Sequence, residues 1–249
     1  MCLFEKDNGM TSINFERNQI LCDELERLSQ ACGEDRILLI TAGLDALLEV
    51  RVSDKERERA SSMEAMTARR FLSARRLVRG VFSKLLGIPV KEIVLELNAY
   101  GKPSLAGTDH YLSIAHSGEV VAIAVSRSEI GVDLEFEREI DIPGLSRRFF
   151  SPEEALYLEK NSDPSHFFRL WTCREAAIKA DGRGLGHLLG KTKVAADRGT
   201  EGDPIDVTIS EDAWTAFHWR EAAGMHLATA FRKRPSLISW CDLRRQVIV

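Results

Sequence analysis

Two acidic residues, Asp133 and Glu135, stand two positions apart between the apolar residues of segment 130–135. Side chains at positions i and i+2 of a β-strand share a face, so both carboxylates are expected to project together. Mg²⁺ prefers hard oxygen ligands of this kind, and a cation between two carboxylates offsets their repulsion. A solvated strand edge carries the same Asp-x-Glu pattern, so these two residues alone leave both interpretations open.

Glu175 and Lys179 are four residues apart, which places both side chains on the same side of a helix. A surface ion pair has the same spacing. Their neighbours, however, are apolar over most of the helix circumference: Leu170, Trp171, Ala176, Ala177, Ile178 and Ala180. On a largely buried helix, a Glu-Lys pair must be paired, coordinated or directed into a cleft.

Three further features could contact an anion. His116 stands where an apolar strand gives way to a turn, from which its ring and the backbone amides can donate to a phosphate, although a loop histidine is often a plain surface residue. Lys102 and Pro103 follow Gly101 in a second turn. Segment 69–84 has no acidic residue and six basic ones, which predicts a local anion site: Arg69, Arg70, Arg75, Arg76, Arg79 and Lys84.

The elements that must position these residues can be predicted from periodicity. We expect a buried strand at 37–40, a capping box at 53–56 that opens a helix, and a helix over 67–86 that ends at Gly87. On this second helix Arg70 and Arg75 border an apolar stripe from opposite sides, so a long side chain can lie on apolar surface and extend its charge into a cleft.

The remaining segments predict strands and helices in an order that occurs twice. Strands are expected at 93–97, 111–114, 120–125 and 130–136, helices at 143–150, 151–160 and 165–181, and strands again after 191, including 214–219 and 225–231. The prediction is an α+β fold of two similar halves, 37–127 and 128–249, with the second half carrying the metal site. Residues 1–36, with a helix at about 18–32, are expected to be an N-terminal extension.

Composition excludes several classes of protein. Of 249 residues, 44% are hydrophobic and 29% charged, as in ordinary globular proteins. The net charge of −4 argues against a general nucleic-acid binder. No apolar run approaches the roughly 18–20 residues of a membrane span, and the first residues do not resemble a secretory signal, so a cytoplasmic protein is expected. Five scattered cysteines without Cys-x-x-Cys spacing predict reduced thiols.

Taken together and in this order, the motifs resemble the 4'-phosphopantetheinyl transferase superfamily of the Sfp type, over about residues 37–194. The family pattern has a Gly-Lys-Pro turn, a Ser-His-Ser segment, a Gly-x-Asp-x-Glu strand and a Trp-Thr/Ser-x-Lys-Glu-Ala-x-x-Lys helix. Two positions depart from it: Arg174 replaces a lysine and Ala115 replaces a serine. The resemblance implies two α+β halves related by a pseudo-twofold axis.

The resemblance also implies roles for individual residues. Asp133, Glu135 and Glu175 would bind Mg²⁺, which bridges the pyrophosphate of coenzyme A. Lys179 would contact that pyrophosphate, and Glu175 would take a proton directly or through a water, so the catalytic set is Asp133, Glu175 and Lys179. The residues expected to bind coenzyme A are Arg70, with the 3'-phosphate, Arg75, Lys102, Pro103, Ala115, His116 and Lys179.

The implied reaction moves the 4'-phosphopantetheine group from coenzyme A to a serine of an apo acyl or peptidyl carrier protein. We expect a monomer, with Arg147 and Arg148 near the carrier, although a solvated helix face explains these arginines equally well. Three alternatives compete with this function: a coenzyme A-binding protein without catalysis, a nucleic-acid contact through 69–84, and another Mg²⁺-dependent phosphotransferase. The last alternative would need a Gly-x-x-x-x-Gly-Lys-Ser/Thr loop, which this sequence lacks.

Overall fold

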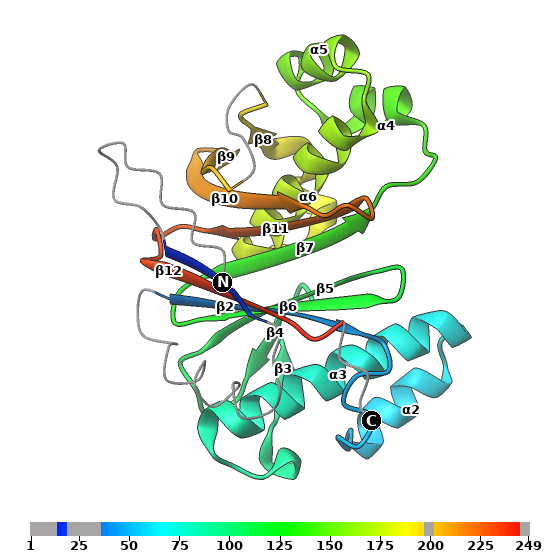
Figure 1. Cartoon of the computed structure of the whole chain (residues 1–249), viewed down its shortest axis with the longest axis vertical. Coiled ribbons are helices and arrows are strands. Elements are labelled where there is room, and N and C mark those ends of the chain that lie inside the picture. The colour runs from blue at the N-terminus through cyan, green and yellow to red at the C-terminus, as the bar shows by residue number, and fades with distance from the viewer. Residues whose placement is uncertain (1–13, 19–35, 197–201, 245–249) are drawn as a thin grey trace. The chain divides into compact units, whose positions relative to one another are not determined.

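The computed structural model describes residues 14–18, 36–196 and 202–244, which divide into two compact units. The first contains the described residues up to Glu96, then Ser104–Ser128 and those from Arg234 onward; the second contains Leu97–Pro103 and the described part of Glu129–Lys233. Each unit has one β-sheet with helices, so the fold is α+β as predicted (Figure 1). The predicted division after residue 127 lies next to this change, but the units are not continuous segments.

In the described part of the chain, the first sheet has seven strands in the order β1-β12-β2-β6-β5-β4-β3. They are β1 (Asn14–Asn18), β12 (Leu237–Asp242), β2 (Arg36–Gly43), β6 (Val120–Ser126), β5 (Tyr111–Ser117), β4 (Pro103–Leu105) and β3 (Leu95–Leu97). Strand β12 pairs in parallel with both β1 and β2, so a late segment of the chain lies inside this sheet.

This pairing differs from two predicted boundaries. The predicted second half, 128–249, did not include a strand that returns to the first sheet, and residues 14–18 of the predicted extension are paired with β12. The physical reason is that strand pairing joins segments far apart in sequence, which local periodicity does not report. The helix predicted at about 18–32 lies outside the described residues, except that Asn18 ends strand β1.

Two helices, α2 (Asp54–Ser61) and α3 (Ala65–Leu86), belong to the first unit. The predicted capping box is confirmed, because the Ser53 hydroxyl accepts from the Glu56 amide and the Glu56 carboxylate accepts from Ser53 N–H. Helix α3 ends at Gly87, whose φ of +66° suits glycine. Its apolar stripe packs on β5 and β6, with Phe82 fully buried. A short 3₁₀ helix, η1 (Val90–Glu92), follows.

The second sheet has the order β7-β11-β10-β9-β8. Strands β7 (Ile130–Phe136) and β11 (Met225–Phe231) have the predicted bounds, and they are joined by β10 (Asp212–Arg220), β9 (Ile205–Ile209) and β8 (Thr192–Val194). The helices of this unit are α4 (Ile142–Phe149), α5 (Pro152–Lys160), α6 (Pro164–Asp181) and α7 (Leu185–Leu188), followed by η2 (Leu189–Lys191).

Helix α6 runs along the face of the second sheet and contacts each of its five strands (Figure 1). Asp163 caps its first turn and Gly182, at φ +83°, ends it. Ten of its residues are buried, which explains why its sequence is apolar around most of the circumference. None of the helices among the described residues has the length and apolar character that a membrane crossing requires.

Candidate active site

Strand β7 and helix α6 approach most closely at Gly131. A Cβ atom added there would lie 1.8 Å from the carbonyl oxygen of Ala176, a separation that no side chain can occupy. Glycine therefore allows the helix backbone to lie directly on the strand. This close approach places Asp133 on β7 opposite Glu175 and Lys179 on α6.

The side chains of Asp133, Glu175 and Lys179 form the centre of the candidate site. The Lys179 ammonium lies 2.6 Å from Asp133 Oδ1 and 4.0 Å from Glu175 Oε2. Asp133 is buried, and the other two are partly buried. The structure thus brings together all three residues predicted to be catalytic. The alternative of a solvent-exposed surface ion pair does not describe Glu175 and Lys179.

The electrostatics of this cluster favour a further cation. Burial, followed by the neighbouring Asp133 carboxylate, raises the pKa of Glu175 to about 8. Burial also raises the pKa of Asp133, even though Lys179 opposes the shift. Burial disfavours the Lys179 charge, but attraction to Asp133 and Glu175 leaves its pKa raised. Two carboxylates thus share one ammonium, and this incomplete neutralisation keeps both reluctant to ionise.

The second oxygen of Asp133 supplies a direct test for a metal ligand. Asp133 Oδ2 is buried and makes no hydrogen bond within the described residues. An unpartnered buried carboxylate oxygen beside Glu175 fits the donor chemistry of Mg²⁺. Within the described ranges, however, no group of three or more His, Cys, Asp and Glu side chains is arranged to hold a metal ion. The donors fit Mg²⁺ in kind but are not gathered into a complete set.

Glu135 accounts for part of this difference. Its Oε2 accepts a hydrogen bond of 2.7 Å from Arg138, three residues further along the chain. A guanidinium and a divalent cation compete for the same carboxylate oxygens. The predicted third ligand is therefore held by an arginine that sequence reasoning did not consider.

Sequence reasoning also missed how Glu175 is oriented. The side chain of Trp171, one turn earlier on α6, interacts with the Glu175 carboxylate and partly opposes the rise of its pKa. The Trp171 ring is held by aromatic neighbours, with Phe167 stacked at 5.7 Å and the Phe149 ring edge-on at 5.9 Å. The i,i+4 spacing of Trp171 and Glu175 was a readable signal, because such residues meet on one helix face.

In the first unit, Arg70 and His116 lie around one turn. Arg70 Nε donates to the carbonyl of Gly118 at 3.0 Å, and the exposed His116 stands two residues before that glycine on β5. Ala115, the neighbouring predicted contact, is buried on β5. The structure therefore brings Arg70 to the turn that follows His116.

Arg75 lies elsewhere on the same helix. Its Nε is 3.7 Å from Glu56 Oε1, and its guanidinium covers the Phe71 ring at 4.8 Å. The same carboxylate accepts a hydrogen bond of 2.9 Å from the buried Arg79. Much of the basic charge predicted to mark an anion site is thus met by acidic side chains from other segments.

Lys102 and Pro103 belong to the second unit, although Pro103 is also the first residue of β4, a strand of the first sheet. The Lys102 ammonium donates to the carbonyls of Ala180 at 2.6 Å and Ile130 at 3.3 Å. Its side chain is directed at the ends of α6 and β7. The structure does not bring Lys102 into contact with the carboxylate cluster.

The sequence model of the 4'-phosphopantetheinyl transferase superfamily matches residues 129–230. A 4'-phosphopantetheinyl transferase of Bacillus subtilis is 32% identical over 151 residues, which are 59% of this chain and 67% of that protein. This chain belongs to the 4'-phosphopantetheinyl transferase superfamily.

Other members of the superfamily match over a shorter span. The 4'-phosphopantetheinyl transferase gsp of Aneurinibacillus migulanus is 39% identical over 47% of this chain and 50% of its own length. The transferase psf-1 of Bacillus pumilus is 33% identical over 49% of this chain and 54% of its own length. The chain thus matches about half the length of these curated superfamily members, and the matched family region contains β7 and α6.

Arg174, which departs from the superfamily pattern, is fully buried. It donates to the carbonyls of Phe149, Leu189 and Thr192 at 2.8, 2.7 and 2.5 Å. Its other terminal nitrogen bonds Glu154 at 2.6 Å. A lysine ammonium has three donors and no planar fork, so it cannot repeat this pattern. In this member of the superfamily Arg174 ties α6 to Phe149, Leu189, Thr192 and Glu154.

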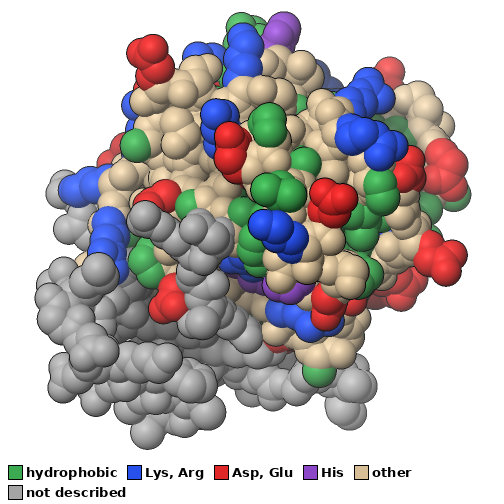
Figure 2. Space-filling model, turned by 90° about the horizontal axis from the view of Figure 1, so that it is seen from above, with side chains coloured by type: hydrophobic (Ala, Val, Ile, Leu, Met, Phe, Trp, Pro, Cys, Tyr) green, Lys and Arg blue, Asp and Glu red, His purple; other side chains and the backbone are tan. Residues whose placement is uncertain are grey.

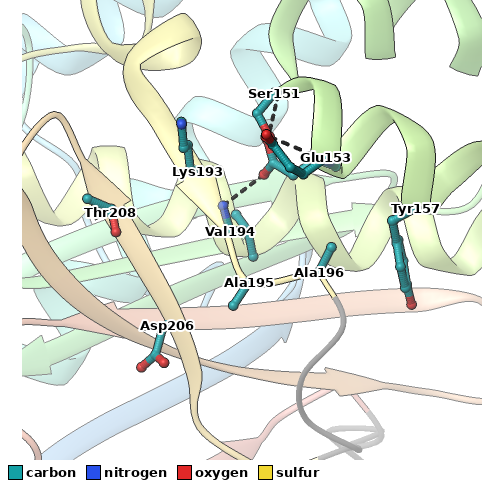
Figure 3. Close-up of a pocket in the computed structure, with 10 residues that line it drawn as sticks. Ser151, Glu153, Tyr157, Lys193, Val194, Ala195, Ala196, Asp206 and Thr208 are labelled. Atoms are coloured by element: carbon teal, nitrogen blue, oxygen red, sulfur yellow. Dashed lines mark hydrogen bonds between the residues drawn. The ribbon is translucent and has the colours of Figure 1, made fainter.

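A cavity of about 460 Å³ lies between α5 and strands β8 and β9. Figure 3 shows the residues that line it. Polar and apolar side chains line it, including Tyr157, Lys193 and Thr208. None of the residues predicted to bind Mg²⁺ or coenzyme A lines this cavity. The superfamily site is therefore located by its side-chain chemistry, not by the volume of this cavity.

Proposed function

We propose that this chain transfers the 4'-phosphopantetheine group of coenzyme A to a serine hydroxyl of an apo carrier protein. The observation that supports the proposal best is the cluster of Asp133, Glu175 and Lys179, with a buried carboxylate oxygen left unpartnered, in a chain of this superfamily. Several relatives are named as 4'-phosphopantetheinyl transferases.

The proposed reaction is a displacement at phosphorus. The serine oxygen forms a bond to the β-phosphorus of coenzyme A, the bond from that phosphorus to the bridging oxygen breaks, and 3',5'-ADP leaves. The serine proton passes to the Glu175 carboxylate, which burial and the neighbouring Asp133 carboxylate make a stronger proton acceptor than an exposed glutamate. Lys179 stabilises the negative charge that develops on the departing phosphate.

Asp133 and Glu175 would hold Mg²⁺, and Glu135 would join them once Arg138 releases it. When bound, the ion neutralises charge on the diphosphate oxygens. Asp133 is well suited to this role, because Lys179 occupies one of its oxygens and leaves the other available. Lys179 also limits the net negative charge of the buried cluster.

The remaining predictions about coenzyme A are carried forward as part of the proposal. Arg70 and His116 are the candidates for phosphates of the nucleotide end, since both lie around the turn at Gly118. Arg75, paired with Glu56, is a weaker candidate. We also retain the pseudo-twofold relation of the two units, and the assignment as a monomeric cytoplasmic protein.

The proposed partner is an acidic carrier domain. Arg147 and Arg148 are exposed on α4 and could meet it through complementary charge. In the view of Figure 2, Lys and Arg side chains are interspersed with Asp and Glu instead of forming one continuous basic area. On this face the pattern lacks the continuous basic stripe that tracking of nucleic-acid phosphates needs.

Mass spectrometry of carrier proteins tests the proposal. The purified chain is incubated with coenzyme A, Mg²⁺ and a panel of apo-carrier domains, and a carrier should gain the mass of the prosthetic arm. Asp133→Ala should abolish the gain while the circular dichroism spectrum stays that of the folded protein. Coenzyme A binding without any transfer would instead identify a binding protein and overturn the proposed activity.

A further inference from the structure

Lys102 joins the two elements that carry the candidate active site. Its ammonium donates to the carbonyl of Ile130, the first residue of β7, and to the carbonyl of Ala180 in the last turn of α6. An ammonium has three donors and can serve both acceptors at once. One side chain thus holds the start of the strand with Asp133 and the end of the helix with Glu175.

The turn that contains Lys102 is itself fixed to the end of α6. Asn98 donates from Nδ2 to the carbonyl of Gly182 at 3.0 Å. The Oδ1 atom of Asn98 accepts from the backbone N–H groups of Tyr100 and Lys102, both at 2.9 Å, which shapes the turn. Gly182 leaves room for the lysine, because a Cβ there would come within 2.8 Å of Lys102 Cδ.

The Lys102 ammonium stabilises the C-terminal end of α6. The last carbonyls of a helix lack intrahelical partners and carry partial negative charge, so a lysine there both satisfies and stabilises them. Burial lowers the pKa of Lys102 to about 8, partly offset by the charges of Glu129 and Asp181. A side chain held at that energetic cost is expected to have a positional role.

We propose that Lys102 is a positioning residue that sets the spacing between β7 and α6, and through it the geometry of the metal-binding carboxylates. The inference rests on the proposed function and assigns the lysine side chain to the protein's own framework instead of to coenzyme A. Glu175 is five residues before Ala180, about 8 Å along the helix. Asp133 is three residues after Ile130, about 10 Å along the strand. A displacement at the lysine end of these stiff elements is carried to both carboxylates.

The experiment separates metal geometry from coenzyme A contact. The binding of Mn²⁺ alone to the full chain is measured from the electron paramagnetic resonance signal of the free ion. Lys102→Met keeps the stem of the side chain and removes its donors. Its affinity for Mn²⁺ should fall by about tenfold, the usual size of an effect transmitted to metal ligands by their supports. The Michaelis constant for coenzyme A, measured at saturating Mg²⁺, should change much less.

Two variants serve as controls. Lys160→Met removes an exposed lysine from α5 and should bind Mn²⁺ like the wild type. Lys102→Arg, which can still donate to both carbonyls, should retain most of the affinity. If Lys102→Met does not fold, Asn98→Ala decides the question, because it frees the turn and keeps the lysine: weaker Mn²⁺ binding supports the inference and unchanged binding overturns it.

The possible failures are distinguishable. Unchanged Mn²⁺ affinity in Lys102→Met, with a raised Michaelis constant for coenzyme A, would return the lysine to a substrate contact and overturn the inference alone. Absence of Mn²⁺ binding by the wild-type chain would overturn the proposed metal site and this inference together. Absence of transfer by a wild-type chain that binds Mn²⁺ normally would overturn the proposed activity and leave the positioning role supported by the affinity data.

Discussion

A glutamate carboxylate lies beside helix α3 and another lies on helix α6, but neighbouring groups neutralise the two to different degrees. Beside α3, burial opposes ionisation of Glu56, yet hydrogen bonds from Arg79 and from Ser53 keep its pKa below the ordinary value. Beside α6, burial and Asp133 raise the pKa of Glu175 to about 8. A fully paired carboxylate serves the fold, whereas an incompletely paired one is ready for an added cation or a proton.

Glu175→Gln, on α6, should have the largest effect on activity. Removing the proposed base and metal ligand is expected to lower the transfer rate by about a thousandfold. The melting temperature should stay the same or rise, because the folded environment disfavours the charged form of Glu175. The rate is measured by mass spectrometry of the carrier and the melting temperature by circular dichroism. A near-normal rate would remove Glu175 from the chemistry.

Glu56→Gln is the matched change on the α3 side and should have the opposite profile. It leaves the buried Arg79 without its carboxylate, so the free energy of unfolding should fall by about 3–5 kcal/mol. The transfer rate of the protein that remains folded should be close to that of the wild type. Urea denaturation measures the first quantity and the carrier assay at low temperature the second. Equal losses of rate in the two glutamine variants would erase the distinction between the helices.

Lys102 extends the comparison to a cation bonded to carbonyls instead of to a carboxylate. Its pKa is about 8 in the folded protein against an ordinary 10.5, so between these pH values the unfolded chain holds more protons. Its contribution to the free energy of unfolding should therefore rise with pH across that window, by up to about 3 kcal/mol. The difference between wild type and Lys102→Met, from urea denaturation at pH 7.5 and 10.5, isolates this contribution; a flat difference contradicts it.

Arg138→Gln, near the α6 cluster, should have the smallest effect, which is on the affinity for Mn²⁺. The change removes the cation that holds Glu135, and an exposed pair of this kind is worth little, so Mn²⁺ should bind about two- to fivefold more tightly. The measurement is again the resonance signal of free Mn²⁺. Weaker binding in this variant would mean that Arg138 supports the metal site instead of competing for it.

Much of the fold followed from local sequence signals. The capping boxes at Ser53 and Ser151 are both present, because each depends on residues three positions apart. Strands β7 and β11 have the predicted bounds, since their apolar runs end at clear turns. Strand β12 was not predicted, because its pairing with β1 and β2 depends on contacts with segments near the other end of the chain.

Part of the candidate site could also be predicted from the sequence. Asp133, Glu175 and Lys179 could be chosen because their residue types are costly on buried surfaces and their spacings place them on one face. The partners of Arg75, Lys102 and Glu135 could not be predicted. Each is a long or acidic side chain with several contacts in reach, and tertiary packing decides which one forms.

The interior position of β12 has a consequence for synthesis of the protein. During translation β2 is made early, but the strand that covers one of its edges, Leu237–Asp242, leaves the ribosome only after the whole second unit. Until then the nascent first sheet presents an uncovered row of backbone donors and acceptors, which invites pairing with other chains. We expect the yield of folded protein to depend on how quickly strand β12 is synthesised and paired.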